Sequence, residues 1–226
     1  MNNTSRFSTA TLKLKAQSRI SVHAGENSVI NNALLPRMPN PFCVIITENV
    51  YNVLDVVGDV TNTDVFEIPF VLTGYYDMEN QQVIIDDGFV QHNSESGRLK
   101  AVATHESEKY ATDFIRSAKP NENKVIVFGH THTRVGGYYL NFSWGDIKGY
   151  IDTYEQNRDF FNNHNLSMLA CLLTGGNFNF LFCNNEDTYR FDNVFVQRNN
   201  GDLEKLPAFG PDVVNINNRY NGNIGR

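Results

Sequence analysis

Apolar residues recur along the chain at two spacings, one typical of helices and one of strands, and both are concentrated between residues 43 and 198. In the stretch "CVIITENVYNVLDVVGDV" the helical spacing i, i+3, i+4, i+7 is met by Val50, Val53, Leu54 and Val57. Thr47 is a candidate N-cap for this helix, and we expect the helix to end at Gly58.

Two short runs rich in β-branched and aromatic residues follow, "FVLTGYY" (70–76) and "QVIIDDGFV" (82–90). The turn-forming residues "DMENQ" lie between them, so the pattern predicts an antiparallel hairpin. The remaining pattern predicts, in order, a helix over 106–118, a buried strand over 124–129, a loop or short strand over 137–143, a helix over 146–163 and two or three strands within 166–198.

This order of elements predicts an α+β domain in which helices flank a mixed β-sheet in an α/β/α arrangement. We place the domain at residues 43–198. Residues 1–42 are a polar N-terminal extension, and residues 199–226 are a Gly/Pro/Asn-rich C-terminal tail that we expect to be loose.

Composition and charge narrow the classes of function. The formal net charge is -6 and no stretch is strongly basic, so we expect neither a nucleic-acid partner nor an anionic membrane partner. No apolar run reaches the ~18 residues of a membrane helix, and the N-terminus lacks the apolar core of a secretory signal. The three cysteines, Cys43, Cys171 and Cys183, lie among apolar neighbours, as buried reduced thiols do. We therefore expect a cytoplasmic protein.

Two histidines directly follow the predicted strand over 124–129. On an extended segment side chains alternate, so His130 and His132 project to one side and Thr131 to the other. Asp146, near the start of the next predicted helix, can supply a third ligand. Two imidazoles and a carboxylate are a common ligand set for catalytic zinc, because the fourth position stays open for water. We therefore predict one zinc ion per chain, held by these three side chains.

A zinc site that activates water also needs a general base and a group that stabilises the developing negative charge. Glu67 is the candidate base, because it directly precedes an apolar strand, where a carboxylate has no evident structural purpose. Ser143 is the candidate oxyanion donor, because a hydroxyl can lie near a metal without competing for it. Ser143 and Asp146 also have a structural alternative, as the N-cap and first-turn acid of the following helix.

These five residues resemble the pattern of the JAMM (MPN+) metalloproteases, which is a glutamate before an apolar strand, H-[ST]-H after a second strand, and then S-x-x-D. The matching segments are Glu67 in "EIPFVLTG", "HTH" at 130–132 and "SWGD" at 143–146. The resemblance covers about residues 47–195. It implies an MPN/JAB-like fold with cytidine-deaminase-like layering, and a zinc peptidase or isopeptidase in which the two histidines and the aspartate hold the metal.

The resemblance also implies a protein or peptide substrate, of which a ubiquitin-like tail is one candidate. Residues 133–142 separate His132 from Ser143, a longer segment than is usual in the family, and Thr133 replaces the proline commonly found there. A longer loop beside the site reshapes the substrate groove. Neither the particular substrate nor the oligomeric state is therefore implied.

Three other functions fit parts of the same pattern. A non-catalytic MPN-like scaffold would share the fold, although such relatives typically lose ligands that this sequence keeps. A metal-stabilised domain could bind the C-terminal tail of a partner without cutting it. Calcineurin-like metallophosphoesterases also contain "GHTH" (129–132), but the D-x-H and G-N-H-[DE] segments that complete their two-metal site have no counterpart here.

Overall fold

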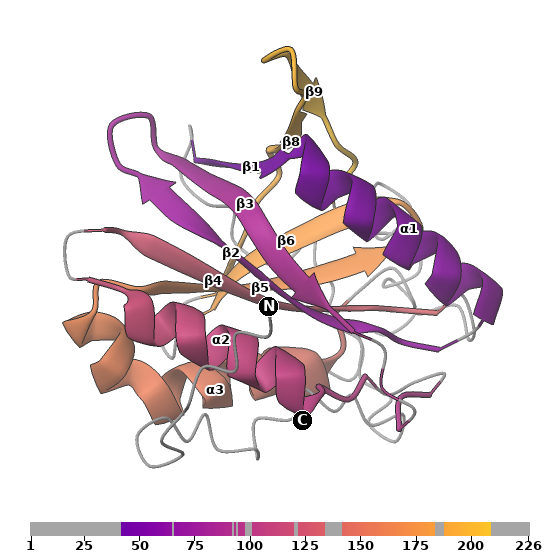
Figure 1. Ribbon diagram of the computed structural model, residues 1–226, viewed down its shortest axis with the longest axis horizontal. Coiled ribbons are helices and arrows are strands. Elements are labelled where there is room, and N and C mark those ends of the chain that lie inside the picture. The colour runs from indigo at the N-terminus through magenta and orange to yellow at the C-terminus, as the bar shows by residue number, and fades with distance from the viewer. Residues whose placement is uncertain are drawn as a thin grey trace, which may run out of the picture.

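The computed structural model describes residues 42–64, 66–91, 93, 95–97, 101–119, 122–133, 142–183 and 188–208. Within these residues the elements are β1 (Cys43–Thr47), α1 (Glu48–Asp64), β2 (Pro69–Asp77), β3 (Gln82–Val90), α2 (His105–Ser117), β4 (Lys124–Thr131), α3 (Trp144–Asn163), β5 (Ser167–Thr174), β6 (Asn177–Cys183), β7 (Thr188–Arg190), β8 (Val194–Gln197) and β9 (Leu203–Lys205). The strands form one mixed sheet in the order β7-β6-β5-β4-β2-β3-β1-β8-β9. The predicted α+β class, with a mixed sheet flanked by helices, is confirmed (Figure 1).

Helices cover both faces of the sheet (Figure 1). On one face α1 packs through residues such as Leu54, and on the other α2 and α3 pack through residues such as Ile115 and Tyr150. Alternation along β4 supplies both cores, because Val127 belongs to the α1 side and Phe128 to the α2 and α3 side. Along β4, odd-numbered residues therefore face α1, and even-numbered residues face α2 and α3.

The central strands bring distant residues together. β2 is antiparallel to β4, with Pro69 paired to His130, and the Thr131 N–H donates to the Ile68 carbonyl over 3.0 Å. β4 is parallel to β5, and α3 is the crossover between them. The start of β2, the end of β4 and the start of α3 consequently lie at one end of the sheet.

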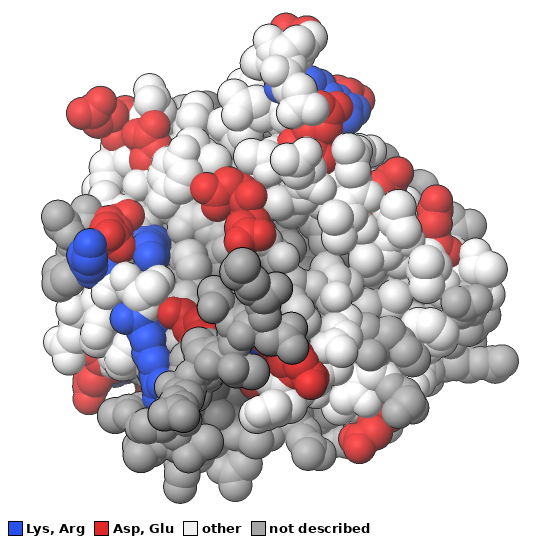
Figure 2. All heavy atoms as spheres, viewed as in Figure 1, with Lys and Arg blue, Asp and Glu red and all other residues white. Residues whose placement is uncertain are grey.

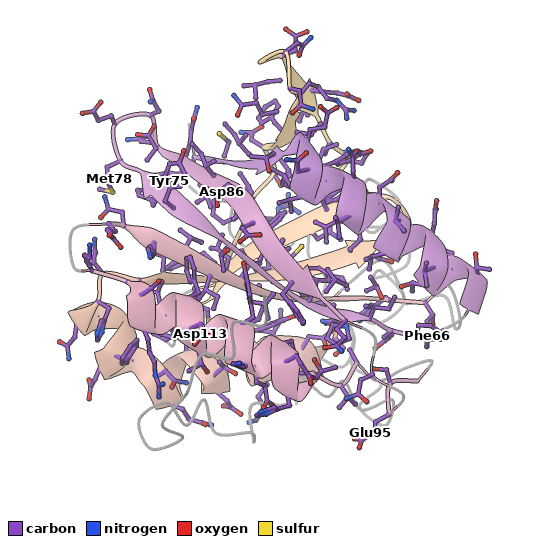
Figure 3. All side chains as sticks on the ribbon, in the orientation of Figure 1. Phe66, Tyr75, Met78, Asp86, Glu95 and Asp113 are labelled. Atoms are coloured by element: carbon purple, nitrogen blue, oxygen red, sulfur yellow. The ribbon has the colours of Figure 1, made fainter. Side chains whose placement is uncertain are left out.

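The opposite end of the β2–β3 hairpin is exposed. Tyr75 and Met78 are 42% and 63% exposed and project from the hairpin (Figure 3). His130, by contrast, is fully buried in β4, beside the start of β2 and therefore at the other end of the sheet. The buried end is therefore the one where polar side chains need a specific explanation.

The N-terminal elements differ from the prediction. "CVIIT" is a separate strand, β1, which pairs in parallel with β3 and β8. The predicted helix end at Gly58 is wrong, because α1 continues to Asp64. Its last turns are held by a tertiary contact, since Thr61 is buried and its hydroxyl lies 2.7 Å from that of Thr131.

The C-terminal segment contributes further structure. Residues 203–205, which the sequence places in the tail, form β9 at the edge of the sheet, and Leu206 is buried. Residues 1–41 and 209–226 lie outside the described residues, as do 134–141 between the histidines and α3.

Two further expectations concern cysteines and membranes. Cys43 and Cys171 are buried free thiols, and burial raises the pKa of each, while the side chain of Cys183 lies outside the described part. In the part of the chain that the structure describes, none of the helices combines the length and apolar character needed to cross a membrane.

Candidate metal centre

The side chains of His130, His132 and Asp146 meet where β4 ends and α3 begins. The Nε2 atoms of the two histidines are 3.0 Å apart, and they lie 3.4 Å and 3.5 Å from the two carboxylate oxygens of Asp146. One possible ligand atom from each residue lies within 4.8 Å of the other two, and all three side chains are buried. The fold thus brings the predicted ligand set together, and this group can hold a metal ion.

Strand alternation separates His130 from Thr131, as the sequence predicted. His130 faces α3, where its Nδ1 lies 3.0 Å from the hydroxyl oxygen of Tyr150. Thr131 faces α1 and contacts Thr61. His132 follows β4, and its N–H donates to the Leu173 carbonyl of β5 over 3.2 Å, so the backbone continues along β5.

Tyr150 is a residue of the site that the sequence analysis missed. A metal ligand at Nε2 of His130 requires the proton to be on Nδ1, and this N–H then donates to the Tyr150 hydroxyl. Tyr150 is fully buried, so its position is fixed by packing. The signal was available in the sequence, because Tyr150 lies four residues after Asp146 and therefore on the same face of a helix.

A capping box at the start of α3 fixes Asp146. The Asp146 N–H donates to Ser143 Oγ over 3.1 Å, and the Ser143 N–H donates to Asp146 Oδ2 over 2.6 Å. The other carboxylate oxygen, Oδ1, is buried and has no hydrogen-bond partner among the described residues. The cap therefore anchors Oδ2, which also lies beside His132, while Oδ1 lies beside His130 and accepts no hydrogen bond from the described residues. The cap uses Ser143 Oγ only as an acceptor, so its hydroxyl proton can still be donated.

Glu67 is buried beside this group. Because Pro69 pairs with His130 and Ile68 with Thr131, continuing the antiparallel pairing by one residue places Glu67 opposite His132. Its side chain is 2% exposed, and its Oε2 has no hydrogen-bond partner among the described residues. Burial raises the pKa of Glu67 to about 8, while the charge of His132 lowers it and that of Asp146 raises it. The structure thus brings all five predicted site residues to one end of the sheet.

The protonation states suit a cation. Burial lowers the pKa of His130 to about 4, with Asp146 raising it and His132 lowering it, so the His130 imidazole is neutral at pH 7, as a metal ligand must be. Burial acts to raise the pKa of Asp146, but His130, His132 and the Ser143 N–H outweigh it, and the pKa is lowered. Closely spaced ring nitrogens beside a buried carboxylate oxygen that has no hydrogen-bond donor among the described residues fit a divalent cation, to which each of the three side chains can offer a lone pair.

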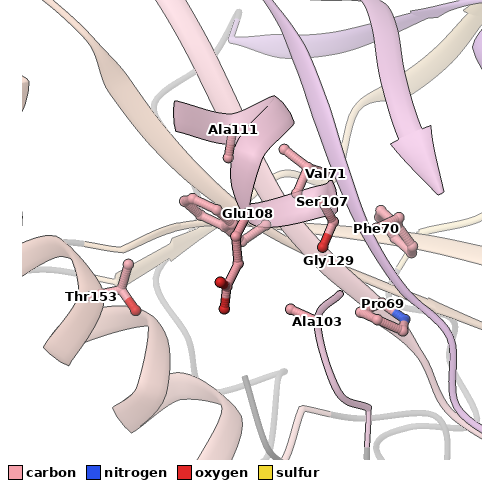
Figure 4. A pocket seen from close by; sticks show the side chains of 10 residues that line it. Pro69, Phe70, Val71, Ala103, Ser107, Glu108, Ala111, Gly129 and Thr153 are labelled. Atoms are coloured by element: carbon pink, nitrogen blue, oxygen red, sulfur yellow. The ribbon is translucent and has the colours of Figure 1, made fainter. Parts of the chain in front are cut away.

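Two hollows lie in this part of the molecule, and one of them includes a residue of the group in its lining. A cleft lies between α1, the β5–β6 turn and residues 204–207, and His132 is part of its lining. A small pocket lies between β2, β4, α2 and α3, on the other side of the sheet (Figure 4). Its lining is mostly apolar, and Glu108 and Thr153 project into it from α2 and α3.

Comparison with known proteins assigns the chain to no family. No protein-family model matches it, and no curated protein matches it. The geometry of the site is therefore the observation that bears most directly on function.

Proposed function

We propose that the protein is a zinc-dependent peptidase or isopeptidase of the JAMM type, with an MPN/JAB-like fold. The observation that carries this proposal is the convergence of two imidazoles and a carboxylate on one point, beside the buried carboxyl group of Glu67. Three protein ligands leave a tetrahedral zinc ion with one open position, as catalysis requires. The hairpin, helix and strand between Glu67 and His130 also agree with the resemblance.

In this proposal a different contact holds each of the three ligand residues in position. His130 is oriented by Tyr150, and Asp146 is anchored through Oδ2 while Oδ1 serves as the ligand. His132 is held by its backbone hydrogen bond to β5. When bound, zinc supplies the Lewis acidity that activates water and polarises a carbonyl group.

Glu67 is the general base of the proposed reaction. The water that attacks the scissile carbonyl carbon gives a proton to the Glu67 carboxylate, and Glu67 passes it to the departing amine as the C–N bond breaks. This role requires an ionised carboxylate, whereas burial raises its pKa to about 8 in the metal-free protein. A cation held beside it lowers that pKa again, because opposite charge favours the ionised form. The Ser143 hydroxyl donates to the oxyanion.

One observation favours a single metal over the two-metal phosphoesterase. Among the described residues, only His130, His132 and Asp146 form a group of His, Cys, Asp or Glu side chains with the spacing of metal ligands. A two-metal site needs further ligands at the same place.

The test combines metal content with turnover. We expect about one zinc ion per chain in wild-type protein purified without a metal-affinity tag, and loss of this zinc in His132→Ala. His164→Ala, at the C-cap of α3, is the matched control and should keep its zinc. Zinc-loaded wild type should cleave peptide or isopeptide bonds, and a chelator should stop the reaction.

Two outcomes would contradict the proposal in different ways. Full zinc content in His132→Ala would refute the ligand assignment. A zinc-loaded wild type that cleaves neither peptide nor isopeptide bonds would refute the hydrolase and favour a non-catalytic scaffold.

A further inference from the structure

The cleft beside His132 has one wall that is a single face of α1. Tyr51, Asp55, Asp59 and Asn62 line it at helical spacing, one or two turns apart. The opposite wall is the β5–β6 turn with residues 204–207. His132 and Thr131 also line the cleft, so it extends to the candidate metal centre.

The α1 wall is acidic and lacks compensating charge. Asp55 and Asp59 are exposed, and α1 contains no Lys or Arg. Within the described residues neither aspartate forms an ion pair, whereas Glu204 on the opposite wall pairs with Arg198. Figure 2 shows acidic side chains along α1 on this view of the molecule. The cleft therefore presents two carboxylates on α1, one helical turn apart, and its opposite wall carries one cation, Lys205, which forms no ion pair with either aspartate among the described residues.

Both walls of the cleft contain glycine, at Gly58 on α1 and at Gly175 and Gly176 in the β5–β6 turn. A Cβ at Gly58 would lie 3.7 Å from Leu173, an ordinary contact, so packing does not require glycine there, although alanine forms helices better. On the other wall Gly175 and Gly176 both have positive φ, and a Cβ at Gly176 would meet no atom within 4 Å. Glycines on both walls leave space for a polypeptide backbone.

We propose that this cleft binds an extended substrate chain and selects a Lys or Arg side chain near the scissile bond through Asp55 and Asp59. The inference rests on the proposed function, because it takes the group that includes His132 to be the place where the bond is cut. Two carboxylates without a basic partner attract a cationic side chain and repel an acidic one. Asp55 and Asp59 thus determine specificity without taking part in the reaction.

The test compares peptides that differ only in charge. Each quenched fluorogenic peptide carries Lys, Gln or Glu at one test position. The set is repeated with the test position at each residue that flanks the scissile bond. The enzymes are wild type and Asp55→Asn/Asp59→Asn, which keeps side-chain shape at two exposed helix positions. The matched control, Glu79→Gln/Asp159→Asn, removes two exposed charges outside the cleft.

We expect wild type to favour the best Lys peptide over its Glu counterpart by roughly ten-fold in kcat/KM, the sum of two exposed charge pairs. The preference should fall to about one in the cleft variant, persist in the control, and weaken with salt because exposed charges are screened. Gly58→Leu gives a second readout. It should raise KM for all three peptides at unchanged zinc content, while Gly58→Ala should not.

Failure of this inference is distinguishable from failure of the proposed function. Binding of the same peptides to zinc-loaded Glu67→Gln, measured by fluorescence anisotropy, is independent of turnover. A charge preference in binding that needs Asp55 and Asp59, in a protein that cleaves nothing, would support the cleft and refute the hydrolase. Cleavage without charge preference, or with a preference that survives Asp55→Asn/Asp59→Asn, would overturn the cleft alone. Absence of both binding and cleavage would overturn both.

Discussion

Two groups of polar side chains are buried on opposite sides of the end of β4, and their hydrogen bonding differs. On the α1 side, Thr131 Oγ1 accepts from the Ile68 N–H over 2.9 Å and lies 2.7 Å from the hydroxyl oxygen of Thr61. On the α3 side, Glu67 Oε2 and Asp146 Oδ1 have no hydrogen-bond partner among the described residues. The hydroxyl groups on the α1 side therefore have hydrogen-bond partners within the protein, whereas the two carboxylate oxygens on the α3 side have none among the described residues.

This difference separates a folding role from a binding role. A buried hydroxyl pair with its hydrogen bonds formed offsets the loss of hydration. A buried carboxylate oxygen without a donor raises the free energy of the folded protein, unless a ligand supplies the missing partner. Changes to Thr61 and Thr131 should therefore act on stability, and changes to Glu67 and Asp146 on metal binding and turnover.

The largest effect is expected for Glu67→Gln. Without the base, kcat should fall by roughly 100- to 10,000-fold, because proton transfer by a positioned side chain contributes about that much. Zinc content should be unchanged, since Glu67 is not one of the proposed ligands. Glu95→Gln, at an exposed position, is the control and should keep full activity. A variant that kept the wild-type rate would refute the base assignment.

Asp146→Asn distinguishes the structural role of the Asp146 side chain in the capping box from its proposed role as a metal ligand. The amide oxygen of Asn can still accept from the Ser143 N–H, so the stability of the metal-free protein should change by less than about 1 kcal/mol. A neutral amide is a much poorer zinc ligand, and zinc affinity should fall by at least about 100-fold. Competition with a fluorescent chelator measures the affinity, and urea unfolding measures the stability. If the zinc affinity of Asp146→Asn were unchanged, Asp146 would not be a metal ligand and would act only in the capping box.

Substitution of Thr131, on the α1 side, should instead lower stability and leave zinc binding unchanged. Thr131→Val keeps the shape but leaves the Ile68 N–H without its acceptor, so the free energy of unfolding should fall by about 1–3 kcal/mol at unchanged zinc content. Thr63→Val, at an exposed position, should cost less than about 0.5 kcal/mol. Thr61→Val/Thr131→Val should cost less than the sum of its single changes, because the two hydroxyls share one hydrogen bond. Zinc loss in Thr131→Val without loss of stability would contradict the separation of roles.

The same strand end shows how far the sequence predicts the site. Alternation is local, so His130 and Thr131 could be assigned to opposite sides from their order alone. The position of Glu67 opposite His132 depends on the pairing of β2 with β4 across a hairpin and a helix, which no local pattern specifies. Glu67 was found through the family resemblance and through its unusual place before an apolar strand.

The fold, like the site, could be predicted from the sequence where local periodicity is clear, but not where distant residues determine the structure. The hairpin and the later helices have clear periodicity, and the structure contains them. β1 is a five-residue strand with four apolar residues in a row, a run that periodicity cannot distinguish from part of a helix. Gly58 was a misleading stop signal, because the contact between Thr61 and Thr131 extends α1 beyond it. The residues of β9 are all exposed and carry no apolar pattern.

Glu67 and His130 should give the metal-free protein opposite pH dependences. Burial raises the pKa of Glu67 from 4.5 to about 8, so the folded protein keeps a proton that the unfolded chain releases, and stability falls as pH rises from 4.5 to 8. Burial lowers the pKa of His130 from 6.5 to about 4, so the unfolded chain binds the proton first, and stability falls as pH drops from 6.5 to 4. Relative to wild type, Glu67→Gln should therefore gain stability between pH 4.5 and 8 in urea unfolding with a chelator present. A constant difference across that range would contradict the raised pKa of Glu67.

Two substitutions of Ser143 decide whether that residue serves folding or catalysis. Ser143→Ala removes the N-cap of α3 and should cost about 1 kcal/mol, whereas Ser143→Gly should cost only a few tenths, because glycine is tolerated at that position. Both variants remove the hydroxyl. If that hydroxyl donates to the oxyanion, kcat should fall equally in the two variants, although their stabilities differ. If kcat instead follows stability and Ser143→Gly remains active, Ser143 acts only through the helix cap and belongs with Thr131 among the residues that serve folding.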